Sequence, residues 1–229
     1  MGFDPEDGDL VADNLACLRG ERLIFNGLSC VLSAGGALVL TGANGSGKSS
    51  LLRVLATLLA PAAGRVMWGG NAIAADLARY RASLHYVGHL DAIKPALGVR
   101  ETLAFWAGMR GTPAPELDAA LAAFALEPIA DWPCRWLSAG QRRRLALARL
   151  IAAPAPLWLL DEPTASLDAD GERRLVAAIA AHRASGGRVA IATHQAMALG
   201  EARMLALEEF APGTDDLGTD RADDPLAGF

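Results

Sequence analysis

A glycine-rich octapeptide directly after a short apolar run is the feature that most limits what this chain can fold into. The apolar run, residues 37–41, has the length and aliphatic content of a strand buried on both faces. The octapeptide, residues 42–49, matches G-x-x-x-x-G-K-[ST], and residues 49–59 continue with the spacing of a buried helix. A strand, a glycine loop and a helix in this order predict a phosphate-binding loop in an α/β domain.

The residue types of the loop suit a phosphate ligand better than the simple alternative, a flexible glycine turn. Glycines adopt positive φ, and N–H groups at a helix N-terminus then point at the anion. Lys48 is expected to reach the β- and γ-phosphates of ATP, and the Ser49 hydroxyl to ligate Mg²⁺. Lys48 and Lys94 are the only lysines among 21 basic residues, so a compact ammonium stands here against the chain's preference for arginine. The predicted ATP-binding residues are Gly42, Ala43, Asn44, Gly45, Ser46, Gly47, Lys48, Ser49 and Ser50.

Strands and helices alternate along much of the chain. Apolar runs at 10–18, 28–32, 66–68, 157–160 and 188–192 have strand character, and residues 168–184 form an amphipathic helical pattern. Alternation of this kind predicts an α/β fold with a mainly parallel sheet covered by helices on both faces.

Between the predicted strands at 66–68 and 157–160, apolar residues recur at helical spacing, which predicts a helical insert. We expect one domain over residues 8–207, in which residues 85–149 form the insert and residues 8–84 and 150–207 form the core. Residues 208–229 are rich in Asp, Gly and Pro and predict a disordered acidic tail.

Bulk composition excludes several classes of protein. A net charge of −5 over 229 residues argues against a nucleic-acid-binding surface. Cys17, Cys30 and Cys134 are odd in number and far apart, so free thiols are expected rather than disulfides or a structural zinc site. The acidic N-terminus lacks the apolar region of a signal peptide, and no stretch approaches the roughly 20 apolar residues of a membrane-spanning helix. We expect a soluble chain that meets a membrane only through partner subunits.

Two adjacent carboxylates end the apolar run 157–160. Neighbouring strand residues point to opposite faces, so Asp161 and Glu162 are expected to have different roles. Asp161 suits the Mg²⁺ shell, and Glu162 suits a general base that polarises the attacking water. The alternative for the pair is an acidic helix cap before Pro163. His194 closes another predicted strand and is a candidate to hold the γ-phosphate and the attacking water, or else an ordinary polar strand end.

Three further motifs resemble those of the ABC ATPases. Residues 137–141 (LSAGQ) resemble the LSGGQ signature, residues 165–168 resemble the D-loop, and His194 resembles the switch histidine. The resemblance covers about residues 10–207 and implies a P-loop NTPase core with an antiparallel β subdomain and an inserted helical subdomain. It also implies a homodimer, in which Ser138, Gly140 and Gln141 of one copy close over ATP bound by the other, and a D-loop role for Asp168.

The chain departs from the family pattern at three places. Ala139 replaces the first signature glycine, and His89 stands where the Q-loop glutamine is expected, which makes His89 a candidate Mg²⁺ ligand. No clear adenine-stacking aromatic is present, and Arg19 and Phe25 lie near its usual place. The basic run 142–144 is expected to face the partner's nucleotide or an acidic surface.

Several short sequence segments point to a narrower group of ABC ATPases: YVGH at 86–89, IKP at 93–95, LSAGQRRR at 137–144 and ATHQ at 192–195. Together they resemble the ATPase subunit of the cytochrome c maturation (haem exporter) complex of bacterial inner membranes. That resemblance implies a peripheral protein on the cytoplasmic face, energising haem export or release of a haem chaperone with integral membrane permease subunits. The alternatives are an ABC transporter subunit for a lipid, drug or metal chelate, a soluble ATPase that works on nucleic acid or ribosomes, and a nucleotide-binding module without catalysis.

Overall fold

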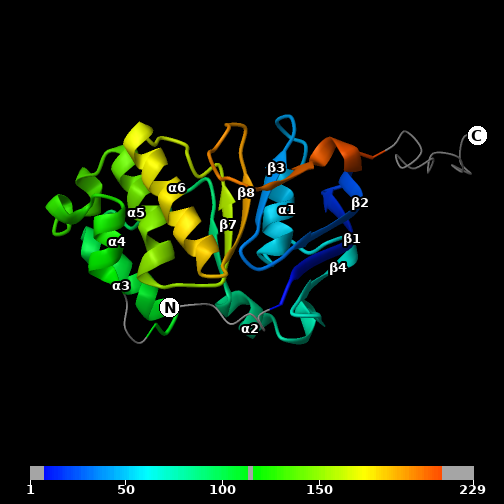
Figure 1. The fold of residues 1–229 in the computed structure, drawn as a ribbon, viewed down its shortest axis with the longest axis horizontal. Coiled ribbons are helices and arrows are strands. Elements are labelled where there is room, and N and C mark those ends of the chain that lie inside the picture. Colours follow the sequence, from blue (N-terminus) through cyan, green and yellow to red (C-terminus); the bar gives the residue numbers. More distant parts are fainter. Residues whose placement is uncertain (1–7, 113–115, 213–229) are drawn as a thin grey trace, which may run out of the picture.

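Two β-sheets flank one central helix. A computed structural model describes residues 8–112 and 116–212. The larger sheet is entirely parallel, in the order β6 (Leu84–Val87), β7 (Leu157–Asp161), β8 (Arg188–Ala192), β3 (Ala37–Thr41) and β9 (Arg203–Ala206). The smaller sheet is antiparallel, in the order β2 (Arg22–Leu32), β1 (Leu10–Arg19), β4 (Ala63–Trp68) and β5 (Asn71–Ala72). Helix α1 (Lys48–Leu55) contacts β7 and β8 on one side and β1 on the other (Figure 1).

Alternation along the buried strands creates two separate cores. In β7, Trp158 and Leu160 join the core under the helices, whereas Leu157 and Leu159 join the core shared with α1 and the antiparallel sheet. The same division recurs along β3 and β8. Because successive strand side chains point to opposite faces, a strand buried on both sides has to be apolar throughout, which explains the continuous apolar runs.

The other face of the parallel sheet carries the helical part of the molecule (Figure 1). Its helices are α3 (Val99–Met109), α4 (Leu117–Ala123), α5 (Ala139–Ala152) and α6 (Ala169–Ala184). Helix α5 contacts α3, α4, α6 and β6, so it joins the helical lobe to the sheet. The remaining elements are α2 (Leu77–Ala82) and the short 3₁₀ turns η2 (Ile73–Ala75), η3 (Glu127–Ile129), η4 (Cys134–Trp136) and η5 (Leu207–Phe210).

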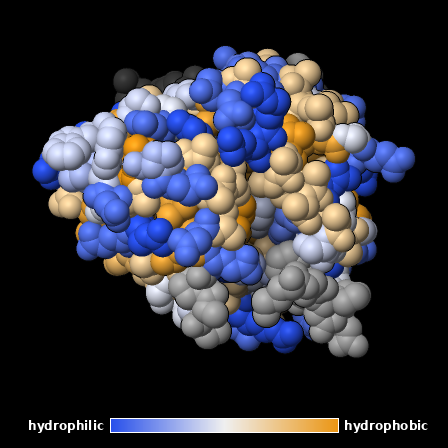
Figure 2. All heavy atoms as spheres, turned by 60° about the vertical axis from the view of Figure 1, so that its left-hand side comes forward, coloured by the Kyte–Doolittle hydropathy of each residue, from blue (hydrophilic) through white to orange (hydrophobic). Residues whose placement is uncertain are grey.

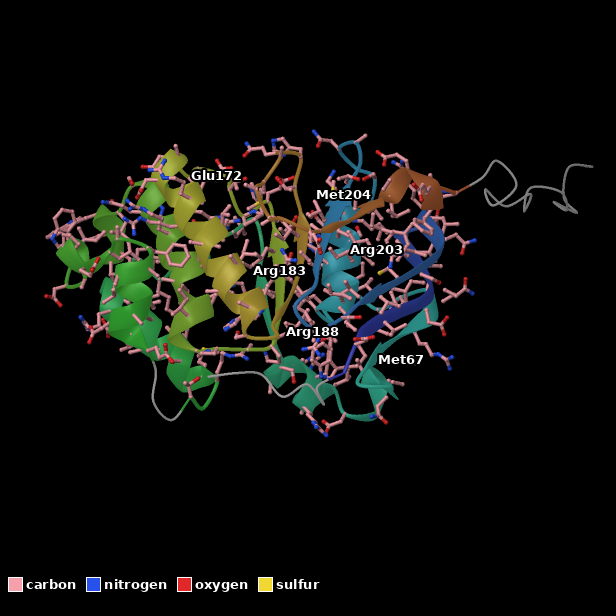
Figure 3. All side chains as sticks on the ribbon, viewed as in Figure 1. Met67, Glu172, Arg183, Arg188, Arg203 and Met204 are labelled. Atoms are coloured by element: carbon pink, nitrogen blue, oxygen red, sulfur yellow. The ribbon has the colours of Figure 1, made fainter. Side chains whose placement is uncertain are left out.

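Arg183 fixes the end of α6 against the sheet. Its guanidinium donates to the carbonyl oxygens of Gly35, Leu199 and Glu201, which lie on loops beside β3 and β9. Figure 3 shows this arginine at the end of α6, with Arg203 and Met204 on the neighbouring edge strand β9. The helix C-terminus is therefore held at the sheet end opposite to the glycine loop.

The predicted fold class is confirmed, and two predicted boundaries are corrected. Residues 84–87 form β6 of the parallel sheet, so the helical insert begins after this strand rather than at residue 85. Residues 207–210 form η5, so the fold continues past the predicted end at 207; residues 213–229 lie outside the described chain. Cys17, Cys30 and Cys134 are free thiols and buried, as expected. None of the described helices is long and apolar enough to cross a bilayer.

Candidate nucleotide-binding and hydrolysis site

The loop between β3 and α1 has the backbone conformation that its glycines predict. Gly42, Gly45 and Gly47 adopt φ values of 137°, 86° and 106°, in the region that disfavours other residues. Gly47 is also required for space, because an added Cβ would lie 2.7 Å from Ile24 and 3.1 Å from Phe25. The loop therefore stands close above the antiparallel sheet, with the N-terminus of α1 behind it.

Lys48 folds over the loop that carries it. It is 7% exposed, and its Nζ donates to the carbonyl oxygens of Gly42 (2.6 Å) and Ala43 (3.0 Å). These carbonyls hold the ammonium at the mouth of the loop, where the predicted phosphates would lie. A buried Lys needs counter-dipoles or anions; the Gly42 and Ala43 carbonyls supply dipoles, and the predicted phosphates would supply anions.

Ser49 and Asp161 meet at the start of α1 and the end of β7. The Ser49 hydroxyl donates to Asp161 Oδ1 at 2.8 Å, and the Tyr86 hydroxyl lies 3.4 Å from Asp161 Oδ2. Burial raises the pKa of Tyr86, which keeps it a phenol that can donate to this carboxylate. Hard oxygen donors of this kind are what Mg²⁺ prefers, so the residues present fit the predicted ion.

A cavity of about 320 Å³ opens beside these groups. It is lined by Arg19, Ile24, Asn44, Gly45, Gly47, Lys48, Ser49, Ser50 and Glu162. Of the two candidates for contact with adenine, Arg19 is at this cavity, whereas Phe25 is completely buried in the core. Phe25 is therefore excluded as a stacking residue, and its ring instead supports Gly47.

Glu162 lines this cavity and pairs with His194, which lines a neighbouring hollow together with Thr41, Gly42 and Thr193. Glu162 Oε2 lies 3.0 Å from His194 Nδ1, and both residues follow neighbouring strands, β7 and β8. Glu162 adopts φ 46°, a left-handed conformation that is uncommon for a non-glycine residue. Its N–H donates to the carbonyl of Ala192, which fixes the chain at this turn. A carboxylate beside an imidazole is a suitable arrangement for activating a water.

The signature residues form the N-terminal cap of α5. Ser138 Oγ accepts from the N–H of Gln141, and Gln141 Oε1 accepts from the N–H of Ser138, so the two form a capping box. A Cβ added to Gly140 would lie 2.9 Å from the carbonyl oxygen of Ser166 in the predicted D-loop. The signature and D-loop of one chain are thus in direct contact.

Asp168 and His89 are not brought to this cavity. Asp168 caps α6 by accepting from the N–H of Gly171 at 2.7 Å. His89 is exposed in the loop after β6, and no hydrogen bond of the described residues joins it to Ser49 or Asp161. Over residues 8–112 and 116–212, no cluster of three or more His, Cys, Asp or Glu side chains could hold a metal ion. The Mg²⁺ role of His89 stays a prediction without support from this geometry.

All three arginines of the run donate to main-chain oxygens of their own chain, and the prediction that they face a partner is wrong for the buried Arg143. Arg143 is 2% exposed and donates to main-chain oxygens around Asp161 and Glu162, and Arg142 donates to the carbonyl of Leu137. Arg144 contacts the carbonyl of Phe124. The run therefore serves the interior of its own chain, because each guanidinium finds carbonyls left unpaired at turns.

Glu208 is a site residue that the sequence did not indicate. Its Oε1 accepts from the N–H of Ala43 at 2.5 Å, so the carboxylate caps the first turn of the glycine loop. Hydrogen bonds from its own N–H and from Ala43 lower the pKa of Glu208. No motif marks this glutamate, since it reaches the loop only through the pairing of β9 with β3.

A family model described as ABC transporter matches residues 25–165. The chain belongs to the ABC transporter family. The chain also resembles the cytochrome c biogenesis ATP-binding export protein CcmA of Rhodospirillum rubrum, with 58% identity over 92% of this chain and 91% of that protein. The proteins of the same name from Paramagnetospirillum magneticum and Agrobacterium fabrum are 53% and 45% identical over 90% and 89% of this chain, and 96% and 97% of theirs.

Solved structures support the ABC fold at lower identity. A putative ABC transporter ATP-binding protein from Pyrococcus furiosus superposes with a TM-score of 0.77 at 19% identity, over 89% of this chain and all of that one. A bacterial Atm1-family ABC exporter with ATP bound gives 0.76 at 24% identity, over 90% of this chain and 38% of that one. These structures support the fold, and the family model together with the relatives confirms the family resemblance drawn from the motifs.

Proposed function

We propose that this ABC protein binds Mg-ATP at residues 42–49 and hydrolyses it, as the ATPase subunit of a cytochrome c biogenesis complex. The observation that carries the proposal is the Glu162–His194 pair, 3.0 Å apart, at a cavity that Glu162 and Lys48 both line. A base and its orienting partner stand beside an ammonium and a row of loop N–H groups. That is the set of groups that hydrolysis of a triphosphate requires.

Different residues of the chain bind the phosphates, activate the water and hold the metal ion. Lys48 and the loop N–H groups hold the β- and γ-phosphates, and Glu162 accepts a hydrogen bond from the attacking water and polarises it. His194, through its ring, keeps the Glu162 carboxylate in place and offers a donor towards the γ-phosphate. Ser49 and Asp161 would hold Mg²⁺, which when bound supplies positive charge to the phosphate oxygens.

The proposal includes a homodimer. Ser138, Gly140 and Gln141 are absent from the residues that line the Lys48 cavity in the described chain, so within one copy the signature does not meet the phosphate loop. Ser138 instead caps α5, whose N-terminus offers N–H groups and a positive dipole end to an anion. A second copy that presents this helix N-terminus would complete each site.

Membrane subunits are the proposed partners, at the cytoplasmic face of the bacterial inner membrane. Large hydrophobic side chains are exposed on the helical lobe: Leu90 (82%), Met109 (72%), Trp136 (62%), Trp132 (44%) and Phe105 (41%). Figure 2 turns this side of the molecule forward and shows apolar residues among the hydrophilic ones. Together with the names of the relatives, this surface supports docking on membrane proteins of cytochrome c biogenesis, in haem export or in release of a haem chaperone. The cavity itself is equally compatible with a transporter for another substrate.

Co-purification tests the proposal. The tagged full-length chain is expressed with the membrane proteins encoded beside it, extracted in mild detergent, and assayed for bound subunits and for ATP turnover. We expect haem-handling membrane subunits to co-purify, and the Glu162→Gln variant to retain them while losing turnover. Recovery of an unrelated permease would assign the chain to another transporter. Turnover that survives Glu162→Gln would refute the proposed hydrolysis site.

A further inference from the structure

Arg143 has a contact set that neither the ATP site nor the signature explains. It lies in α5, five residues after Ser138, and its side chain is 3% exposed. Its Nε donates to the carbonyl of Pro163 (3.1 Å), and its Nη2 donates to those of Asp161 (3.1 Å) and Glu162 (2.8 Å). Its Nη1 donates to the carbonyl of Gly88 (2.9 Å) and to the Asp91 carboxylate (3.0 Å). A guanidinium has five N–H donors, and these five acceptors match them in number.

Three of these acceptors belong to the turn that carries the proposed base. The left-handed conformation of Glu162, with φ 46°, brings the carbonyls of three successive residues towards one side. Such a conformation persists only where the surroundings hold it. The main chain of Glu162 is held from two sides. Its N–H donates to the Ala192 carbonyl of β8, and its carbonyl accepts from the Arg143 guanidinium. This double support aims the Glu162 carboxylate at His194.

The other two acceptors belong to the loop that follows β6. Gly88 and Asp91 flank His89 and Leu90, and Leu90 is the most exposed of the large hydrophobic side chains on the helical lobe. One planar cation thus bridges the loop at 88–91 and the turn at 161–163. Displacement of either segment costs hydrogen bonds to the same buried charge, and such bonds are stronger than those between neutral groups.

We propose that Arg143 is a positioning residue for hydrolysis, which aims Glu162 and makes its position depend on the loop at residues 88–91. This inference rests on the proposed role of Glu162 as the base. Its neighbours serve as a contrast. Arg142 and Arg144 contact the carbonyls of Leu137 and Phe124, and neither bonds to the turn at 161–163. Lysine at position 143 would keep the charge but offers one nitrogen, which cannot span two segments.

The test compares Arg143→Lys with Arg144→Lys, a matched change at the adjacent position. ATP affinity is measured by calorimetry, and kcat and KM by steady-state turnover of the full-length chain, with the melting temperature of each variant as a folding check. We expect Arg143→Lys to bind ATP within about threefold of wild type but to lose about tenfold or more in kcat, as a misplaced base does. Arg144→Lys is expected to keep kcat within about twofold, because its contacts lie away from the turn.

A double variant separates a positioning role of Arg143 from a general loss of structure. If Arg143 acts through Glu162, then Arg143→Lys should lower the residual rate of Glu162→Gln by less than about threefold, since effects of coupled residues are not additive. Asp91→Asn provides a variant at the partly exposed end of the bridge. It should lower kcat severalfold while leaving ATP affinity and melting temperature unchanged.

The results that overturn the inference are distinct from those that overturn the function. A wild-type kcat in Arg143→Lys refutes the positioning role, as does an equal fractional loss of kcat on the wild-type and Glu162→Gln backgrounds. An unchanged kcat in Asp91→Asn refutes the link to the loop. Failure of the proposed function looks different, because wild-type turnover itself would then be absent or independent of Glu162, and this inference would fall with it.

Discussion

Acidification should destabilise this fold through one buried histidine. His85 lies on β6, is 6% exposed, and its Nε2 lies 2.6 Å from the carbonyl oxygen of Ala153. Burial, reinforced by the charge of Arg110, lowers the pKa of His85 from 6.5 to about 3. The folded chain therefore keeps His85 neutral at a pH where the unfolded chain protonates it. Stability from this residue is complete above the unfolded pKa and is lost as the pH falls from 6.5 towards 3.

The magnitude follows from the two pKa values. Between about pH 7 and about pH 5 the unfolded histidine goes from about a quarter protonated to almost fully protonated, whereas the folded one takes up almost no proton. Integration over this interval gives a loss of about 2 kcal/mol in the free energy of unfolding from His85 alone. That is a large share of the roughly 5–15 kcal/mol that stabilises a typical domain.

Urea unfolding followed by circular dichroism at the two pH values measures this loss. His85→Gln removes the titration and keeps an amide N–H that can donate to the Ala153 carbonyl, and His89→Gln, at an exposed histidine, is the control. Wild type and His89→Gln should lose about 2 kcal/mol more than His85→Gln on acidification. An equal loss in wild type and His85→Gln would refute the assignment of this proton uptake to His85.

Three further predictions concern the site. Lys48→Ala should weaken ATP binding by about 10- to 100-fold in calorimetry, as loss of a charged hydrogen bond of about 1.5–3 kcal/mol implies; undiminished affinity would move the phosphates elsewhere. Glu162→Gln should slow turnover by about 10²–10⁴ with ATP binding retained, and an unaltered rate would dismiss it as the base. Gly140→Ala should cost about 1–3 kcal/mol in urea unfolding, because its Cβ would lie 2.9 Å from the Ser166 carbonyl; wild-type stability would mean that the D-loop yields freely.

The elements nearest the phosphate loop could be predicted because local pattern and motif agree there. Strand β3 was predicted with its observed bounds, and β7 was predicted up to the carboxylate that ends it. Both are apolar on two faces, so tertiary packing reinforces the preference that is visible in the sequence. Asp161 ends β7 as predicted, but Glu162 lies after the strand in a left-handed conformation, so strand alternation alone does not explain the direction of its side chain.

The elements that the sequence did not reveal depend on distant partners. Strand β6 is four residues long and contains His85, and among the described strands it pairs only with β7, more than 70 positions away. Strand β9 exposes Arg203 and Met204 at the edge of the sheet, so its apolar signal is weak. The burial of Arg143 was unpredictable for a related reason: its five acceptors come from two segments that only the fold brings together.

The contact between Glu208 and Ala43 has a practical consequence for anyone who shortens this protein. A chain cut after residue 207 would still contain the nine strands seen in the described residues and every sequence motif, yet it would lack the carboxylate that bonds to the glycine loop. A chain cut after residue 212 would keep it. Expression plasmids designed from the motifs alone would miss that difference, and an affinity tag is better attached beyond the short turn at 207–210 than in place of it.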